Sequence, residues 1–301
     1  MAALLVGCLF AAAGRAQAPD FYAHWGDGRA EVSTYAVVQP RYGEPRAGHA
    51  VLIYVTEDIH RDSFVKVESA APASDRIYAL KLNQVLKFVT GIYSYSVMTS
   101  VFSAVEGLDG SGPLALCRLS LSAQEWCGHV FDELVWEDGE LQGRIDSYFE
   151  AEGRHQYELD VPDGFVSEDH LLIQVRELKG AWMEAGEEQP VRILPGLWWL
   201  RQTHRPHEIL SGVLRKGEPS ALTVGDSTWA VVPWSWGWDG YRKTVWVEEA
   251  YPHRLLRWED SAGGSGVLLA SQRLAYWQLH GRDDEVWRER LGIGGSTPPE
   301  P

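Results

Sequence analysis

The chain has 301 residues, of which 45% are hydrophobic and 23% charged, a composition typical of a folded globular protein and unlike that of a disordered chain. Its formal net charge is −15 at pH 7, and no block of basic residues interrupts the acidic surplus. Nucleic acid and anionic lipid surfaces repel such a chain, so we expect neither as a partner.

The first predicted element is an export signal. An apolar run over residues 2–13 is followed by Ala-Gln-Ala, which fits the small-x-small pattern of signal peptidase sites. We therefore predict a signal peptide over residues 1–18. A single β-rich domain is predicted over 19–292, and a disordered tail over 293–301, where Gly, Ser, Thr and Pro predominate.

This reading places the protein in the periplasm or outside the cell. Cys8 lies in a sequence that resembles a lipobox, so an outer-membrane lipoprotein anchored at Cys8 is the alternative. The apolar run is too short to span a bilayer, and no later apolar stretch has spanning length. We therefore expect no transmembrane helix.

Alternation of apolar and polar residues predicts strands through the first half of the chain. In residues 76–89, for example, Leu80, Leu82 and Leu86 share one face, while Lys81 falls on the other. Strands are predicted at 31–38, 49–57, 63–69, 76–89, 92–105, 114–121, 125–136 and 141–150. Short turns rich in Gly and Asp separate several of them, which favours an antiparallel meander over βαβ units.

A helix is predicted over about 167–179. Ser167 suits the N-cap, and Glu168 and Asp169 suit the positive end of the helix dipole. Apolar residues then recur at helical spacing until Gly180, which can end the helix.

Strands resume after this helix, and a short helix is predicted near 284–291. The later strands are predicted at 191–201, 208–214, 228–232, 243–249, 254–259 and 267–276. The predicted fold is therefore mostly β: a large curved antiparallel sheet or open half-barrel, built from two similar-sized halves around one covering helix, with a short C-terminal helix.

The stretch 122–131, SAQEWCGHVF, is the first candidate site. If it is a strand, Glu125, Cys127 and His129 point to one face. A carboxylate, a thiol and an imidazole are the groups of nucleophilic catalysis, and Cys127 with His129 could ligate a metal if further ligands came from elsewhere. The alternative, which we favour, is that Cys127 packs as a small apolar residue and the stretch is one strand of the core.

Cys117 and Cys127 are the two cysteines outside the predicted signal peptide. In an oxidising compartment they could form one disulfide or stay as two free thiols, and the sequence leaves both open.

Tryptophan is unusually abundant, with 14 residues in the chain. Trp234, Trp236 and Trp238 share a face if extended, and together with Trp198 and Trp199 they are the candidate ligand-binding residues, because aromatic platforms stack on sugar rings or line apolar pockets. The alternative is that these rings fill the interior of the curved sheet. Nearby Pro and Gly residues predict that part of the 234–238 run is a loop near a rim.

No motif indicates a cofactor. The pair His204 and His207 matches no metalloprotease spacing, and the Gly-rich stretch 263–266 lacks the Lys-Ser/Thr of a phosphate-binding loop. Adjacent acids such as Asp132 and Glu133 face opposite ways on a strand and form no glycosidase pair.

Four phrases, at 91–102, 122–129, 251–258 and 276–277, resemble a family of exported bacterial proteins of unknown function that is sometimes labelled septum formation inhibitor Maf. The label does not suit this chain, because the Ser-Ala-Ser-Pro-Arg-Arg type motif of true Maf pyrophosphatases is missing. The resemblance implies export and supplies no catalytic residues. The predicted architecture is also similar to periplasmic lipoprotein carriers, which bind acyl chains inside a half-barrel.

The sequence thus favours an exported envelope protein, not an enzyme, that binds an apolar or amphipathic small molecule in a half-barrel lined by Trp and Tyr. One alternative is a hydrolase or metal-binding protein centred on Glu125, Cys127 and His129. A second is a structural module that binds another envelope protein.

Overall fold

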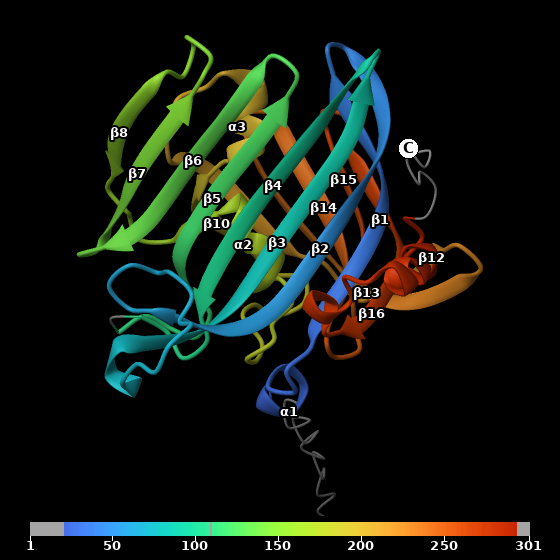
Figure 1. Ribbon diagram of the computed structural model, residues 1–301, viewed down its shortest axis with the longest axis horizontal. Coiled ribbons are helices and arrows are strands. Elements are labelled where there is room, and N and C mark those ends of the chain that lie inside the picture. The colour runs from blue at the N-terminus through green and yellow to red at the C-terminus, as the bar shows by residue number, and fades with distance from the viewer. Residues whose placement is uncertain (1–20, 109, 294–301) are drawn as a thin grey trace, which may run out of the picture.

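The computed structural model describes residues 21–108 and 110–293 (Figure 1). The predicted signal peptide, the lipobox at Cys8 and almost all of the predicted tail lie outside the described residues. As predicted, the chain is mostly β, with one large open sheet of 16 strands and a short C-terminal helix.

The first eight strands follow one another along the chain with short connections. They are β1 (Ala30–Arg41), β2 (Glu44–His60), β3 (Arg76–Thr90), β4 (Tyr93–Ala104), β5 (Ala115–Glu125), β6 (Gly128–Glu137), β7 (Glu140–Ser147) and β8 (Arg154–Leu159).

The other eight strands occupy the second half of the chain. They are β9 (Phe165–Ser167), β10 (Glu188–Leu194), β11 (Leu210–Lys216), β12 (Ser220–Val224), β13 (Ser227–Trp238), β14 (Tyr241–Glu248), β15 (Leu255–Asp260) and β16 (Ser265–Leu274).

The described residues form four α-helices and three short 3₁₀ segments. The helices are α1 (Phe21–Trp25), α2 (Glu168–Gln174), α3 (Leu197–Thr203) and α4 (Val286–Arg290), and the 3₁₀ segments are Ala73–Asp75, Tyr276–Gln278 and Arg282–Glu285.

The two halves of the chain meet at the middle of the sheet. Strands β1 to β8 spread to one side, β16 back to β9 spread to the other, and β1 pairs with β16 between them. Strand β12 pairs only with β13, and the pairing of β9 with β10 is parallel. The first and last strands of the chain are therefore central, and β8 and β9 are the outer edges.

The link between these outer edges makes the sheet curl. Only residues 160–164 separate the end of β8 from the start of β9. Six Cα-to-Cα steps reach at most about 21 Å. The two edges must approach each other to within that distance, so the sheet wraps round, with α2 and α3 on its concave side (Figure 1).

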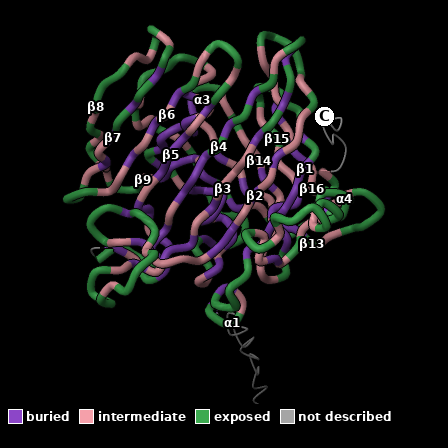
Figure 2. The backbone as a smooth tube through the Cα atoms, viewed as in Figure 1, coloured by how far each residue is buried: buried purple, intermediate pink, exposed green. Residues whose placement is uncertain are grey.

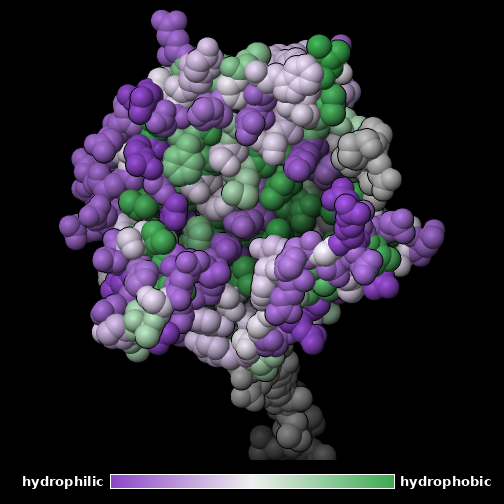
Figure 3. Space-filling model, viewed as in Figure 1, coloured by the Kyte–Doolittle hydropathy of each residue, from purple (hydrophilic) through white to green (hydrophobic). Residues whose placement is uncertain are grey.

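The core fills this concavity. The alternation predicted for β3 is confirmed, since Leu80, Leu82 and Leu86 are buried on the inner face and join residues of α2 and α3 in one apolar cluster (Figure 2). The space-filling view shows hydrophilic residues around the periphery and hydrophobic patches over the strands in front (Figure 3). The alternation of apolar and polar residues therefore correctly predicted which face of β3 is buried and which is more exposed.

Several predicted bounds are wrong. Residues 63–69 form a loop with a single bridge between Ile59 and Lys66, because β2 itself continues to His60 and the chain then turns away. The predicted strand 191–201 ends at Leu194, since Pro195 and Gly196 interrupt it and α3 follows. The covering helix stops at Gln174, and β8, β12, α1 and α3 were not predicted.

A buried ion pair joins the end of α2 to the first strand. Arg176 Nη2 donates to Glu31 Oε2 at 2.8 Å, with the side chains only 0% and 3% exposed. The same guanidinium donates to the backbone carbonyls of Pro252 and His253, and its carbon lies 4.2 Å from the centre of the Tyr54 ring. One cation therefore fixes α2 against β1, β2 and the loop before β15.

Replacing Arg176 with Met is expected to lower the free energy of unfolding by about 3–5 kcal/mol, because Glu31 would remain as a buried, unpaired charge. Urea denaturation measures this. The matched control is Arg154→Met, which breaks an exposed pair with Asp146 and should cost less than about 1 kcal/mol. Equal losses in the two variants would contradict the structural role given to Arg176.

Candidate functional site

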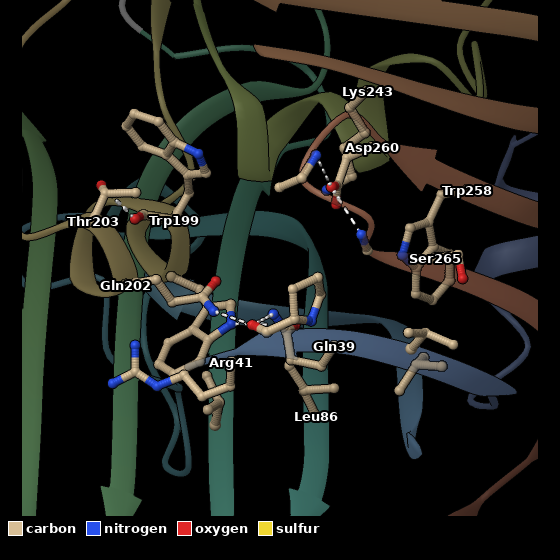
Figure 4. Close-up of a pocket in the computed structure, with 18 of the residues that line it drawn as sticks. Gln39, Arg41, Leu86, Trp199, Gln202, Thr203, Lys243, Trp258, Asp260 and Ser265 are labelled. Atoms are coloured by element: carbon tan, nitrogen blue, oxygen red, sulfur yellow. Dashed lines mark hydrogen bonds between the residues drawn. The ribbon is translucent and has the colours of Figure 1, made fainter. Parts of the chain in front are cut away.

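A cavity of about 300 Å³ lies on the concave side, where α3 meets the β1–β2 turn and the β15–β16 turn (Figure 4). Its lining combines aliphatic side chains, among them Val37, Leu86 and Val97, with three other kinds. The aromatic ones are Tyr42, Trp198, Trp199, Tyr241 and Trp258, the uncharged polar ones are Gln39, Gln84, Thr99, Gln202, Thr203 and Ser265, and the charged ones are Arg41, Glu168, Asp169, Lys243 and Asp260.

Trp198 and Trp199 form an aromatic wall on α3. Trp198 lies against Phe88 and Tyr95, with ring centroids 6.4 and 6.2 Å away, and its Nε1 donates to Gln39 Oε1 at 3.4 Å. The edge of Trp199 meets the buried Trp238, with ring centroids 5.5 Å apart. Both rings are therefore held from behind by the sheet.

Two amides tie this wall to the end of β1. Gln39 Nε2 and Gln202 Nε2 each donate to the carbonyl oxygen of Pro40 at 3.1 Å (Figure 4). The backbone of Pro40 has no N–H and can only accept hydrogen bonds, and its carbonyl accepts both. The contact fixes α3 over the open end of the cavity.

The floor of the cavity is charged, and it also fixes α3. Glu168 Oε2 accepts from the Gly196 N–H at 2.8 Å, and Asp169 Oδ2 accepts from the Leu197 N–H at 2.9 Å. A Cβ at Gly196 would lie 2.9 Å from Glu168 Oε2, which favours glycine there. The acidic first turn of α2 therefore binds the first backbone N–H groups of α3.

Glu168 also gathers two donors from β14. Its Oε1 accepts from the Tyr241 hydroxyl at 3.2 Å and from Lys243 Nζ at 3.3 Å. Burial lowers the pKa of Lys243, but Glu168 and Asp260 outweigh burial and leave that pKa raised. Lys243 therefore stays an ammonium group beside the cavity.

Burial, together with the neighbouring Glu168, raises the pKa of Asp169 to about 6. Its carboxyl group therefore changes protonation state near neutral pH, unlike an ordinary aspartate. Chemically, the floor offers a fixed carboxylate, a fixed ammonium and one carboxyl group that can bind a proton. Such a set suits hydrogen bonding to hydroxyl or amino groups.

A second, larger cavity of about 530 Å³ is lined mainly by apolar side chains, among them Leu114, Trp136 and Phe165. His170 of α2 also lines it, and burial lowers the pKa of this imidazole to about 4, so the ring is neutral at physiological pH. None of the predicted tryptophans lines this cavity. We therefore centre the candidate site on the first cavity.

The structure does not gather the predicted Glu125, Cys127 and His129 group. Strand β5 ends at Glu125, Trp126 and Cys127 form a turn, and β6 starts at Gly128, so the alternation assumed for one continuous strand is broken. Glu125 Oε2 accepts from the backbone N–H of Cys127 at 2.7 Å, which is a turn contact. The exposed Cys127 has a raised pKa because of Glu125, the opposite of an activated nucleophile.

The structure has no disulfide between Cys117 and Cys127, which the sequence left open. Cys117 is buried near the start of β5, and Cys127 lies beyond its other end. The eight strand steps from Cys117 to Glu125 alone span roughly 26 Å, whereas a disulfide needs Cα atoms within about 7 Å.

The five predicted tryptophans separate into two groups. Trp198 and Trp199 line the cavity, but Trp234, Trp236 and Trp238 are buried in the core. The predicted loop near a rim is wrong, because β13 runs unbroken from Ser227 to Trp238. The strand tolerates Pro233 because β12 and β11 pair with β13 before and after it. Interior filling therefore explains Trp234, while the equally buried Trp236 and Trp238 also border a separate cavity of about 480 Å³ beside β11.

Sequence reasoning missed most of the polar lining. Glu168 and Asp169 were assigned only to the helix dipole, and Lys243 was given no role. One signal was available: Gln84 lies on the inner face of β3, between Leu82 and Leu86, and a polar residue in an apolar series marks a cavity or a partner.

Comparison with known proteins gives no family. No family model matches the chain, and neither a curated protein nor a solved structure matches it significantly. The resemblance to the exported family therefore stays a prediction.

Within residues 21–108 and 110–293, no helix is both long and apolar enough to cross a membrane. In the same part of the chain, three or more His, Cys, Asp or Glu side chains nowhere gather as a metal site would require. The weak metal candidates Cys127 and His129 thus gain no further ligand there.

Asp169 is expected to make stability depend on pH between about pH 4 and 6. The native state binds the Asp169 proton more tightly than the unfolded chain does, so the contribution of this group is present at low pH and is lost as pH rises through 6. The Asp169→Asn substitution removes this pH-dependent contribution to stability. The stability of this variant relative to wild type should therefore increase with pH across that window in denaturation curves, and a constant difference would contradict the assignment.

Thiol labelling of the chain from residue 19 onward should modify Cys127 in the native state and Cys117 only after unfolding. Glu125→Gln is expected to speed the labelling of Cys127 at pH 8, because it removes the carboxylate that raises the thiol pKa. Glu137→Gln, at the far end of β6, is the control. A slower or unchanged rate in Glu125→Gln would contradict the contact.

Proposed function

We propose that this protein is a binding protein of the bacterial envelope that holds a small amphipathic molecule in the cavity between α3 and the β1–β2 turn. The observation that carries the proposal is the pairing of the Trp198 and Trp199 wall with fixed amide and charged groups in one cavity. Ligand sites typically combine aromatic surface with a few oriented polar groups in this way.

The polar groups are already held in place by the protein. Trp198 Nε1 is bound to Gln39, the Gln202 amide to Pro40, and Glu168 to Gly196. A ligand therefore meets a prearranged surface and loses little free energy to the ordering of side chains. This rigidity supports binding as the function.

Charge and size define the ligand class. The cavity lining contains three acidic side chains, Glu168, Asp169 and Asp260, and two basic ones, Arg41 and Lys243, which leaves it close to neutral or slightly acidic. A volume of about 300 Å³ is at the lower end of the range for small-molecule sites. We infer a neutral or weakly cationic molecule with one apolar face and several hydroxyl or amino groups, such as a sugar derivative.

The groups at the floor favour binding over catalysis. The carboxylates of Glu168 and Asp169 are used to hold the start of α3. A catalytic carboxyl group must move a proton to or from the substrate, and although Asp169 can bind a proton, its Oδ2 is already bonded to the Leu197 N–H. The hydrolase alternative at Glu125, Cys127 and His129 also lacks support, since these residues lie on two strands and a turn.

The test begins with the chain purified after exported expression. Native mass spectrometry measures the mass of any small molecule that copurifies with it. Methyl, butyl and hexyl glucosides then serve as probes in calorimetric titrations. Trp198→Ala is expected to weaken binding of the best probe at least about tenfold, since stacking and burial of one aromatic ring account for 1.4 kcal/mol or more.

Trp277→Ala is the control, because Trp277 lies outside the cavity. Circular dichroism melting verifies that both variants stay folded. If no probe binds and no extra mass is found, or if Trp198→Ala binds as wild type does, the cavity is not the binding site.

A further inference from the structure

The four most exposed large hydrophobic side chains of the described residues all lie at one end of the sheet. They are Tyr42, Ile92, Trp126 and Tyr148, with exposures of 60%, 82%, 69% and 73%. Each one occupies the connection of a successive hairpin, from β1–β2 to β7–β8. We call these four connections the hairpin rim. They point to the top of Figure 1, and hydrophobic atoms protrude at the upper edge of Figure 3.

The topology places these tips in a row. Neighbouring strands lie about 4.8 Å apart, so successive hairpin tips are about 10 Å apart and the four span an arc of about 30 Å. An aromatic band connects three of the hairpins. The Tyr93 ring lies 6.4 Å from Trp126 and 5.8 Å from Tyr95, and the Tyr95 hydroxyl is 2.8 Å from that of Tyr42.

Turn chemistry does not explain the hydrophobic tips. Tyr42 has φ of +56°, in the left-handed region that Gly, Asn and Asp adopt most easily. At the opposite end of the sheet, the β6–β7 turn has the same kind of backbone and uses Asp138, with φ of +51°. A tyrosine at such a position costs roughly 1 kcal/mol, which its hydroxyl contacts with Tyr95 and Tyr93 partly offset, although its ring stays 60% exposed.

The hairpin rim is also nearly neutral in a strongly acidic protein. Residues 39–47, 87–95, 124–129 and 146–155 carry four basic and five acidic residues, a net charge of −1. The connections at the opposite end of the same eight strands, 61–75, 105–114, 137–140 and 160–164, contain the same number of residues and carry two basic and ten acidic ones, a net charge of −8. The basic residues are Arg41, Arg46, Lys87 and Arg154, and the acidic ones are Glu44, Glu125, Asp146, Glu150 and Glu152. Of the two ends of these eight strands, the hairpin rim is therefore the one with less negative charge.

We propose that the hairpin rim docks this protein on the headgroup layer of a zwitterionic lipid bilayer. Trp and Tyr favour that layer because each ring combines an apolar body with a polar group, and Ile92 can reach the acyl boundary below it. Four separate projecting tips suit a deformable lipid interface better than a flat protein surface. Attachment would rest on these side chains and not on charge.

Docking would bring the cavity to the membrane. Tyr42 and Gly43 belong to the hairpin rim and also line the cavity between α3 and the β1–β2 turn. A molecule with one apolar face could then pass between the lipid headgroups and the cavity. The docking proposal does not depend on the proposed ligand, because vesicle binding is measured without it.

Flotation with phosphatidylcholine vesicles tests the proposal on the chain from residue 19 onward. Wild type is expected to float with the vesicles. The double variant Ile92→Ser and Trp126→Ser is expected to partition into the vesicles at least tenfold less than wild type. It replaces the most apolar side chain of the hairpin rim, Ile92, and the one with the strongest preference for the headgroup layer, Trp126. Replacing a third of the lipid with phosphatidylserine should weaken wild-type binding at low salt, because the chain is acidic.

The control double variant is Val65→Ser and Trp277→Ser, which removes exposed hydrophobic side chains outside the hairpin rim and should float as wild type does. Trp198→Ala should also float normally, so failure of the ligand proposal can be told from failure of this one. Docking is refuted if wild type stays with the soluble fraction or if the control loses as much as the rim variant. It is also refuted if light scattering shows that the rim variant dissociates a dimer, which would make the rim an interface between copies.

Discussion

The pairing of β1 with β16 determines the form of the molecule. Because the first and last strands lie side by side at the centre, each half of the chain must extend outward, and the outermost strands β8 and β9 are consecutive in sequence. The short link between them can be made only if the sheet bends back on itself. The curvature is therefore imposed by connectivity, and the concave face is the place where a cavity can form.

Helix α2 follows that link and carries the second determining contact. It enters the concavity with an acidic first turn, and that turn binds the beginning of α3 through Glu168 and Asp169. The cavity then gathers side chains that are distant in sequence, from Gln39 on β1 through Trp198 on α3 to Lys243 on β14. No local stretch of the chain contains the site.

Short sequence patterns correctly predicted the features that depend on neighbouring residues alone. Alternation identified β3 and its inner face. The pattern at Ser167 located the start of α2, although the Ser167 hydroxyl makes no capping hydrogen bond. The same reasoning failed at 122–131, because period-two alternation continues through a two-residue turn as if it were strand, so Cys127 was placed on the wrong element. It failed at α3 as well, where an apolar Leu-Trp-Trp-Leu run fits a buried strand or a helix equally.

The candidate site was predictable only in part, for the same reason. Aromatic abundance indicated Trp198 and Trp199, but also Trp234, and only packing distinguishes a ring that lines a cavity from one that fills the core. The partners of Glu168 are the backbone N–H of Gly196, 28 residues away, and two side chains on β14, which no spacing rule anticipates.

Because β1 and β16 are central in the sheet, their position also determines the order in which the strands can pair during folding. Ala30 on β1 pairs with Leu274 on β16, so this contact spans most of the described chain. During synthesis, β1 has one edge without a partner until almost the whole chain has emerged, while the meander from β1 to β8 can already assemble from neighbouring strands. Long-range pairing of this kind slows folding and leaves a strand edge exposed to other chains. The meander is therefore the stage at which a helper protein would protect this chain best.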